Sequence, residues 1–416
     1  MKSLLPFFLF IFAYIPPNSV SQEFDFSRAD AHALSAPEHY EQSLENLVDF
    51  LITPFNSEAE KARVIFRWIT DRIEYDTRAY FTGSTGSVTP RVVIQKGKAT
   101  CTGYSQLFKE MATLAGLEAV IINGHSKGYS FNQEKENWDS NHAWNAIRID
   151  GQWKLVDTTW GAGYINQETG TFRKNFDSHY FFTNPTEFIF DHFPEDPAWQ
   201  LLETPLSLDE YKQLVHVKPA FFRHGLALYS HPTAKIETTG PTRIILRVPQ
   251  ESVLTARLSR NESHLPVNQV FVHHTSDKAI IDVTPPQRGH YELEIYAKEY
   301  GSLNPVFEWV LSYSITSNRE SADSGYPEAF AAFINNRGMV NEPTDFILNA
   351  GEEIYFSLVI PTAASVSVVN NDKWTDLNNN DGIFSGYVTP LEGTVRIAAS
   401  FDGSQQYGVL LEYLAK

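Results

Sequence analysis

The sequence predicts an α+β protein in which one mixed domain is followed by two β-sandwich modules. Residues 22–217 alternate between helical and strand patterns of apolar residues. Residues 218–317 and 325–416 consist almost entirely of short strands and turns, which is typical of β-sandwiches. A chain of 416 residues is long enough for two or three domains.

The N-terminus has the features of a secretory signal. An apolar run from Leu4 to Ile15 is shorter than the roughly 18–20 residues that a membrane-spanning helix needs. Ser19-Val20-Ser21 places small residues before an expected cleavage site at Gln22. We therefore expect residues 1–21 to be removed, and the mature protein to be secreted or periplasmic without spanning a membrane. An uncleaved anchor is the alternative.

The formal net charge of −17 argues against nucleic acid as a partner, because nucleic-acid binding requires basic surfaces. The same charge disfavours an anionic membrane surface as a partner.

Two helices are predicted in the mixed domain. Residues 57–74 carry apolar side chains at helical spacing, with Asn56 or Ser57 as the N-terminal cap. Residues 104–115 form a second apolar helical face, which Gly116 ends. A strand is expected directly afterwards, at 119–122.

A β-hairpin is predicted from residues 142–149 and 152–159, because Asp150-Gly151 is a strong two-residue turn signal. With this turn His142 faces Thr159, and Asp157 lies two residues along on the same face. Diagonal neighbours of this kind have Cβ atoms within roughly 7–8 Å, so a carboxylate can reach an imidazole. A slip of one residue would place the two side chains on opposite faces.

The two β modules resemble each other in sequence. Pro232-Thr233 in the first module matches Pro343-Thr344 in the second, and strands that end at Tyr313 and Tyr413 also correspond. We interpret them as two copies of one sandwich module joined by a linker at 317–327, with coincidental similarity as the alternative.

Cys101 is the only cysteine of the chain. In an exported protein it is a buried apolar residue, half of an intermolecular disulfide or a reactive thiol. Its place at the start of a helix favours the reactive form, because the helix N-terminus stabilises a thiolate. A neighbouring histidine would complete the activation of the thiol. On one face of the hairpin, His142 would be the base and Asp157 the residue that orients it, as in a catalytic triad.

The other histidines that we considered fit loops, aromatic clusters or a β module; they are His125, His179, His192, His273 and His274.

Four segments resemble transglutaminase-like proteins, and specifically the kyphoscoliosis-peptidase and hillarin branch. They are Gly97-Lys98-Ala99-Thr100-Cys101-Thr102-Gly103-Tyr104, Asn123-Gly124-His125-Ser126, His142-Ala143-Trp144-Asn145 and Trp153-Lys154-Leu155-Val156-Asp157-Thr158-Thr159-Trp160-Gly161. The resemblance implies a papain-like transglutaminase core with a catalytic triad. It assigns Cys101 as nucleophile, His142 as general base and acid, and Asp157 as the residue that orients the histidine.

The leading hypothesis is therefore an exported cysteine peptidase or amidase of transglutaminase-like type, acting on a protein or peptide through a thioester. A cross-linking transglutaminase and a non-catalytic binding scaffold are the alternatives. Trp144, Trp160 and Tyr104 are candidate substrate-binding residues, although core packing is the favoured role for most of them. Gln95 is a weaker candidate for the oxyanion hole. No metal or organic cofactor is implied.

Overall fold

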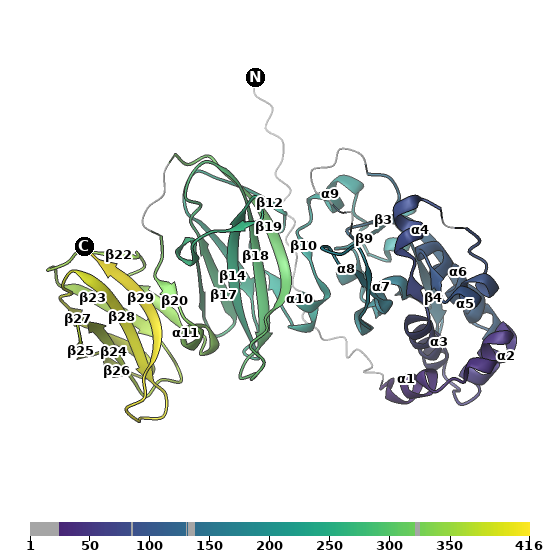
Figure 1. The fold of residues 1–416 in the computed structure, drawn as a ribbon, viewed down its shortest axis with the longest axis horizontal. Helices are drawn as coiled ribbons and strands as arrows, with labels where there is room; N and C mark the ends of the chain where they lie inside the picture. Colours follow the sequence, from purple (N-terminus) through teal and green to yellow (C-terminus); the bar gives the residue numbers. More distant parts are fainter. Residues whose placement is uncertain (1–24, 85, 130, 132–137, 321–324) are drawn as a thin grey trace, which may run out of the picture. The chain divides into compact units, whose positions relative to one another are not determined.

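A computed structural model describes residues 25–84, 86–129, 131, 138–320 and 325–416 (Figure 1). The expected signal peptide, 1–21, lies outside the described residues and stays a prediction. The chain divides into two compact units. The first comprises the residues up to Ile121 together with Ala143–Phe182, and the second comprises Ile122–His142 and Thr183–Lys416.

The first unit consists of helices with short strands between them. Its helices are α1 (Ser27–Leu34), α2 (Leu44–Ile52), α3 (Glu58–Arg72), α4 (Thr77–Thr82), α5 (Pro90–Lys96), α6 (Cys101–Leu114) and α7 (Thr158–Ala162). Its strands include β1 (Glu74–Tyr75), β2 (Lys98–Ala99), β5 (Gln152–Val156), β6 (Gly163–Ile165) and β7 (Phe172–Lys174). It also holds β4 (His142–Ile149) except its first residue and β8 (Phe181–Thr183) except its last residue.

The helix predicted for 57–74 is confirmed as α3. Ser57 is its N-cap, and the Ser57 hydroxyl accepts a hydrogen bond from the Glu60 amide at 3.2 Å. Trp68 and Ile69 on its apolar face are fully buried in the core of this unit. The helix thus forms because a good cap precedes a stripe of apolar residues that the core can bury.

The helix predicted for 104–115 is α6, which begins earlier than expected, at Cys101. Gly103 explains why the first turn packs so closely against its neighbours. A Cβ atom at this position would lie 2.7 Å from the Ala99 Cβ and 3.2 Å from Val93 Cγ2. The glycine therefore lets the start of α6, which carries the cysteine, approach α5 and β2.

The predicted hairpin and its register are confirmed. Asn145 pairs with Val156 and Ile149 with Gln152, and the turn residues Asp150 and Gly151 have φ angles of 47° and 81°. Two positive φ values are characteristic of a type I′ turn, whose twist matches that of the strands. The prediction that the second strand continues to Thr159 is wrong, because β5 ends at Val156 and α7 follows.

The second unit begins with the end of β3 (Ala119–Ser126), which pairs with β9 (His192–Pro194) in an antiparallel ladder. Helices α8 (Pro185–Phe188) and α9 (Leu208–Gln213) lie in the same part of the chain. A small apolar cluster of Ile189, Phe193, Tyr211 and Leu214 connects them.

The first β module of this unit is a sandwich of two sheets, with strand orders β10-β19-β18-β14-β15 and β11-β13-β17-β16. The strands are β10 (His216–Val217), β11 (Ala227–Leu228), β12 (Lys235–Thr238), β13 (Thr242–Arg247), β14 (Ser252–Arg260), β15 (Ser263–His264), β16 (Val270–His274), β17 (Lys278–Val283), β18 (Gly289–Glu299) and β19 (Glu308–Ser317). Helix α10 (Pro219–Arg223) follows β10.

The second β module repeats this topology, with orders β20-β29-β28-β24-β25 and β21-β23-β27-β26. Its strands are β20 (Glu328–Ala329), β21 (Met339–Glu342), β22 (Ile347–Leu348), β23 (Ile354–Val359), β24 (Ser365–Asn370), β25 (Lys373–Asp376), β26 (Asn378–Asn380), β27 (Ile383–Val388), β28 (Gly393–Ser400) and β29 (Gly408–Ala415), with α11 (Ala331–Asn335) after β20. The hydroxyls of Tyr313 and Tyr413 both donate to a backbone carbonyl, at His231 and Pro343, each at 3.0 Å. The matching topology and tyrosines agree with two copies of one module.

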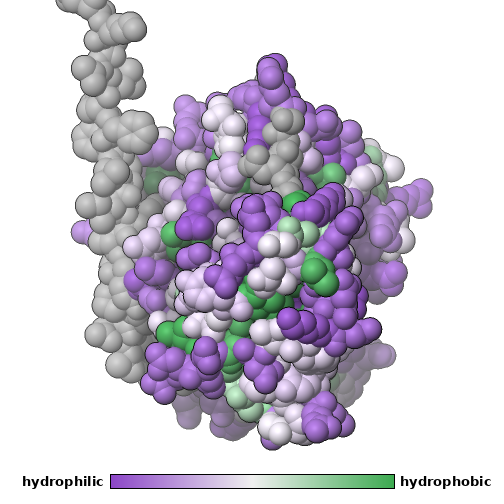
Figure 2. Space-filling view, turned by 90° about the vertical axis from the view of Figure 1, so that its left-hand side faces the viewer, coloured by the Kyte–Doolittle hydropathy of each residue, from purple (hydrophilic) through white to green (hydrophobic). Residues whose placement is uncertain are grey.

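Helices of the described residues are all too short or too polar to cross a membrane. Figure 2 shows one face of the molecule on which hydrophobic residues form small areas between hydrophilic ones. Surfaces of this kind are ordinary for folded proteins.

Candidate active site

Cys101 is the first residue of α6, and its side chain is partly exposed. Thr100 precedes it in an extended conformation, and the carbonyl of Thr100 accepts the first helical hydrogen bonds, from the Gly103 and Tyr104 amides. The partial positive charge at a helix N-terminus lowers the pKa of a thiol placed there. The position therefore combines partial exposure of the thiol with a place at a helix N-terminus.

Tyr75 is a neighbour of the cysteine segment that sequence reasoning missed. Strand β1 pairs with β2 in parallel, and Tyr75 is the partner of Ala99. Burial, followed by the charge of Cys101, raises the pKa of the Tyr75 phenol, and Asp157 adds to the effect. The phenol therefore stays neutral, within the electrostatic reach of both residues. A two-residue strand gives too weak a sequence pattern to reveal this.

Asp157 is fully buried and serves as the N-cap of α7. Its Oδ1 accepts hydrogen bonds from the amides of Thr159 at 2.7 Å and Trp160 at 3.1 Å. Its own amide donates to the carbonyl of Tyr180 at 2.9 Å. These contacts hold the carboxylate in one orientation at the end of β5.

Gly161 allows α7 to lie close to α3. A Cβ atom at this position would be 2.5 Å from Cζ of Phe66 and 3.3 Å from Cγ2 of Thr70. The glycine after Trp160 therefore has a packing role that fixes where the helix capped by Asp157 begins.

His142 is the first residue of β4 and is 8% exposed. Its ring lies beside that of His192, with the ring centroids 5.4 Å apart and the planes inclined by 49°. The sequence suggested only an aromatic-cluster role for His192. Its proximity to His142 depends on the β3–β9 pairing, which joins residues distant in sequence.

Two of the candidate substrate-binding residues are core residues in the structure. Tyr104 is fully buried, and its hydroxyl donates to the carbonyl of Ile73 at 2.5 Å. Trp144 is also almost completely buried. Their burial agrees with the core-packing role that the sequence favoured for most of these residues, and contact of either one with a substrate stays a prediction.

Trp160 is partly exposed, and its ring makes an edge contact with Tyr180 at 5.5 Å between centroids. Its place in a substrate groove stays a prediction. Gln95 is exposed on α5, as expected for a surface residue.

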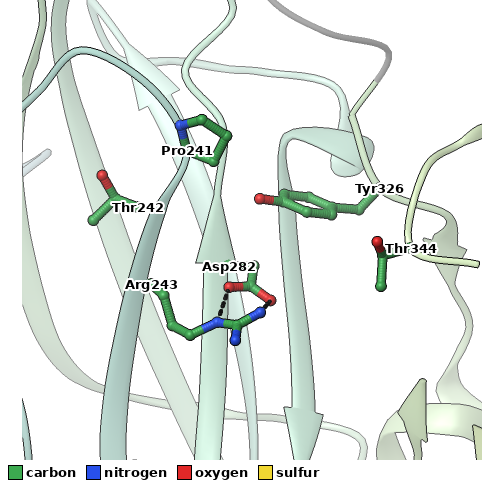
Figure 3. A pocket seen from close by; sticks show the side chains of 6 residues that line it. All are labelled: Pro241, Thr242, Arg243, Asp282, Tyr326 and Thr344. Carbon is green, nitrogen blue, oxygen red and sulfur yellow. Dashed lines mark hydrogen bonds and ion pairs between the residues drawn. The ribbon is translucent and has the colours of Figure 1, made fainter. Parts of the chain in front are cut away.

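A separate pocket of about 360 Å³ is lined by residues of the β modules. Figure 3 shows Arg243 and Asp282 pointing toward each other, with Tyr326 nearby. Two hydrogen bonds of 2.7 and 3.0 Å join the guanidinium to the carboxylate, and His273 Nε2 lies 3.0 Å from the same carboxylate. The charges in the lining therefore compensate each other, and the candidate triad has no member among the lining residues.

Comparison with known families matches two regions of the chain. Residues 46–158 match the model of the transglutaminase-like superfamily. Residues 208–327 match that of the KY-like, immunoglobulin-like domain. The first region includes Cys101, His142 and Asp157.

Two curated relatives are similar to this chain. Kyphoscoliosis peptidase of Mus musculus is 31% identical over 296 residues, which cover 70% of this chain and 43% of that protein. Hillarin of Drosophila melanogaster is 32% identical over 214 residues, or 49% of this chain and 26% of hillarin. The chain thus spans less than half the length of these relatives. It contains a transglutaminase-like domain and a KY-like, immunoglobulin-like domain, and it is similar to kyphoscoliosis peptidase and hillarin.

Proposed function

We propose that the protein is an exported cysteine-dependent acyl-transfer enzyme that hydrolyses amide bonds of a protein or peptide. The position of Cys101 carries the proposal: the only thiol of the chain is a partly exposed first residue of a helix in a transglutaminase-like domain. His142 is the general base and acid, and Asp157 orients it. The hairpin register supports this pairing, because it keeps His142 and Asp157 on one face.

The reaction begins when the Cys101 thiolate attacks the amide carbonyl carbon, forming a C–S bond and an oxyanion. Backbone N–H groups at the start of α6 are suited to stabilise that oxyanion. His142, which holds the thiol proton, passes it to the amine as the C–N bond breaks, and a thioester remains. Water then attacks the thioester, His142 accepts its proton, and the acid leaves as the thiolate is restored.

A lysine amine in place of water would produce a cross-link through the same thioester. The triad therefore serves either outcome, and acceptor access selects between them. Incorporation of a labelled amine into a protein acceptor would identify cross-linking, whereas release of a new carboxyl group without incorporation would identify hydrolysis.

The test is the rate of Cys101 alkylation as a function of pH in the parent and in His142→Ala. An ordinary thiol has a pKa near ~8.5, whereas activated thiols fall to roughly 3.5–7.5. We expect rapid alkylation near pH 6 in the parent and loss of that rate in His142→Ala. Cys101→Ser gives the labelling background, and His264→Ala, at an exposed position, is the matched control.

Slow alkylation with an ordinary pKa, or a parent profile that survives His142→Ala, would contradict the enzyme proposal. The scaffold alternative would then account better for the retained transglutaminase-like domain and its β modules.

A further inference from the structure

A buried histidine–aspartate pair lies beside the candidate general base. His192 is 1% exposed, and its Nδ1 is 2.6 Å from Oδ1 of Asp191. Its ring stacks on Phe188 with the centroids 4.0 Å apart and the planes inclined by 17°. One face of the ring and one nitrogen are thus fixed by neighbours from its own segment.

The backbone of Asp191 and His192 is also held by hydrogen bonds to neighbouring segments. His192 is the ladder partner of Ser126 in the β3–β9 pairing. The amide of Lys127 donates to the carbonyl of Asp191 at 2.9 Å. These backbone contacts fix the position of Asp191 and His192 relative to β3.

His142 is the neighbour that gives the pair a chemical role. The two imidazole rings are 5.4 Å apart, and both are buried. The charge of the pair is on Asp191, which is bonded to the His192 ring, and such a charge shifts the protonation of a buried imidazole nearby because little water screens it. A general base that must both gain and lose a proton is sensitive to such a shift.

Two lysines face Asp191 from other elements. Burial lowers the pKa of Lys127 to about 7 and that of Lys218 to about 8, and in both cases Asp191 opposes the decrease. Lys127 Nζ donates to the carbonyl of Leu214 at 2.9 Å. Lys218 Nζ lies 3.2 Å from Nε2 of His216, whose pKa burial lowers well below its usual value.

Tyr211 is a further neighbour of the carboxylate. Burial and then the charge of Asp191 raise its pKa well above the usual value, so the phenol stays neutral. His192, the two amines and the neutral phenol of Tyr211 thus all face Asp191.

We propose that Asp191 and His192 form a second histidine–carboxylate pair that positions His142 and stabilises its protonated form during acyl transfer. His192 donates its Nδ1–H to Asp191 and stays neutral, so the pair itself has a net negative charge, and at pH 6 this charge faces the protonated amines of Lys127 and Lys218. His192 neither gains nor loses a proton; the thiol proton resides on His142 until the leaving amine takes it. His192 is a positioning residue, and this role rests on the proposed function.

The experiment follows the titration of His142 by NMR in the full chain with 13C-labelled histidine, with His142→Gln to assign the signal. Asp191→Asn removes the charge but keeps the shape of the side chain. We expect it to lower the pKa of His142 by about one unit, and thereby to slow Cys101 alkylation at pH 6 roughly tenfold. Glu195→Gln, which removes an exposed charge from the same segment, should leave both unchanged.

His192→Phe is the second variant, because a phenyl ring keeps the stack on Phe188 while it removes the nitrogen bonded to Asp191. We expect a shift of the His142 titration with this variant as well. A third measurement needs no substitution: 15N shifts in the parent should show His192 neutral and protonated at Nδ1 between pH 5 and 8.

The inference is overturned if both variants fold and keep the parent titration of His142, or if His192 titrates in the parent between pH 5 and 8. Failure of the proposed function has a different signature. In that case the His142 titration still shifts in Asp191→Asn, whereas Cys101 alkylation is independent of His142.

Discussion

Asp157 has two separable tasks at the residue scale, because its carboxylate caps α7 and is also the proposed partner of His142. Asp157→Asn keeps a capping oxygen, so we expect nearly unchanged stability but loss of rapid Cys101 alkylation at pH 6. Asp157→Ala removes both the capping oxygen and the carboxylate proposed to orient His142. Its free energy of unfolding should be lower by about 1 kcal/mol, the usual cost of a missing N-cap. Urea unfolding and pH-dependent alkylation measure the two effects. Equal alkylation in the parent and Asp157→Asn would contradict the orienting role.

Lys127 predicts a pH dependence of stability, also at the residue scale. Its folded pKa of about 7 is below the usual lysine pKa of 10.5, so the unfolded chain binds more protons between these values. The free energy of unfolding therefore gains a contribution that rises with pH from about 7 to 10, and the burial penalty is fully present below 7. Lys127→Met should flatten this rise in urea titrations, whereas the exposed Lys235→Met should not. A parent curve without the rise would show that the amine is not desolvated.

At the scale of elements, the contact of α7 with α3 depends on Gly161. A methyl group there would lie 2.5 Å from Phe66, so the two helices must separate or the ring must move. We expect Gly161→Ala to destabilise the protein by about 1–3 kcal/mol, as overpacking does, and to slow alkylation of Cys101 by displacing Asp157. Phe66→Ala in the same chain should recover part of the alkylation rate. Gly240→Ala is the control, since a Cβ atom there meets nothing within 4 Å.

At the scale of the whole molecule, the two β modules are joined by more than their linker. The guanidinium of Arg337, in the second module, donates to the backbone carbonyls of Pro249 and Thr275 in the first, both at 2.9 Å, and also to that of Ser252. Phe271 of the first module packs against Phe333 of the second, with ring centroids 5.5 Å apart.

We therefore expect the two modules to melt in one calorimetric transition, and Arg337→Ala to divide it into two or to move part of it to lower temperature. Arg396→Ala, which removes an exposed ion pair with Glu412, should leave the shape of the transition unchanged. Separate module transitions already present in the parent protein would disprove the coupling.

The sequence by itself determined the features that depend on nearby residues. Helix α3 followed from a cap and an apolar stripe, and the hairpin register followed from Asp150-Gly151, because local sterics and periodicity decide such elements. The position of Cys101 at a helix start was likewise visible, and the paired motifs of the β modules indicated their shared topology.

Only the tertiary structure decided what depends on distant residues. It ended β5 at Val156, since α7 finds a site on α3 that accepts a glycine and no larger residue. It enclosed Tyr104 and Trp144 in the core, and it placed Tyr75 beside the cysteine segment through the β1–β2 pairing. His192 approaches His142 because β9 pairs with β3. Such contacts join segments far apart in the chain, and no local pattern encodes them.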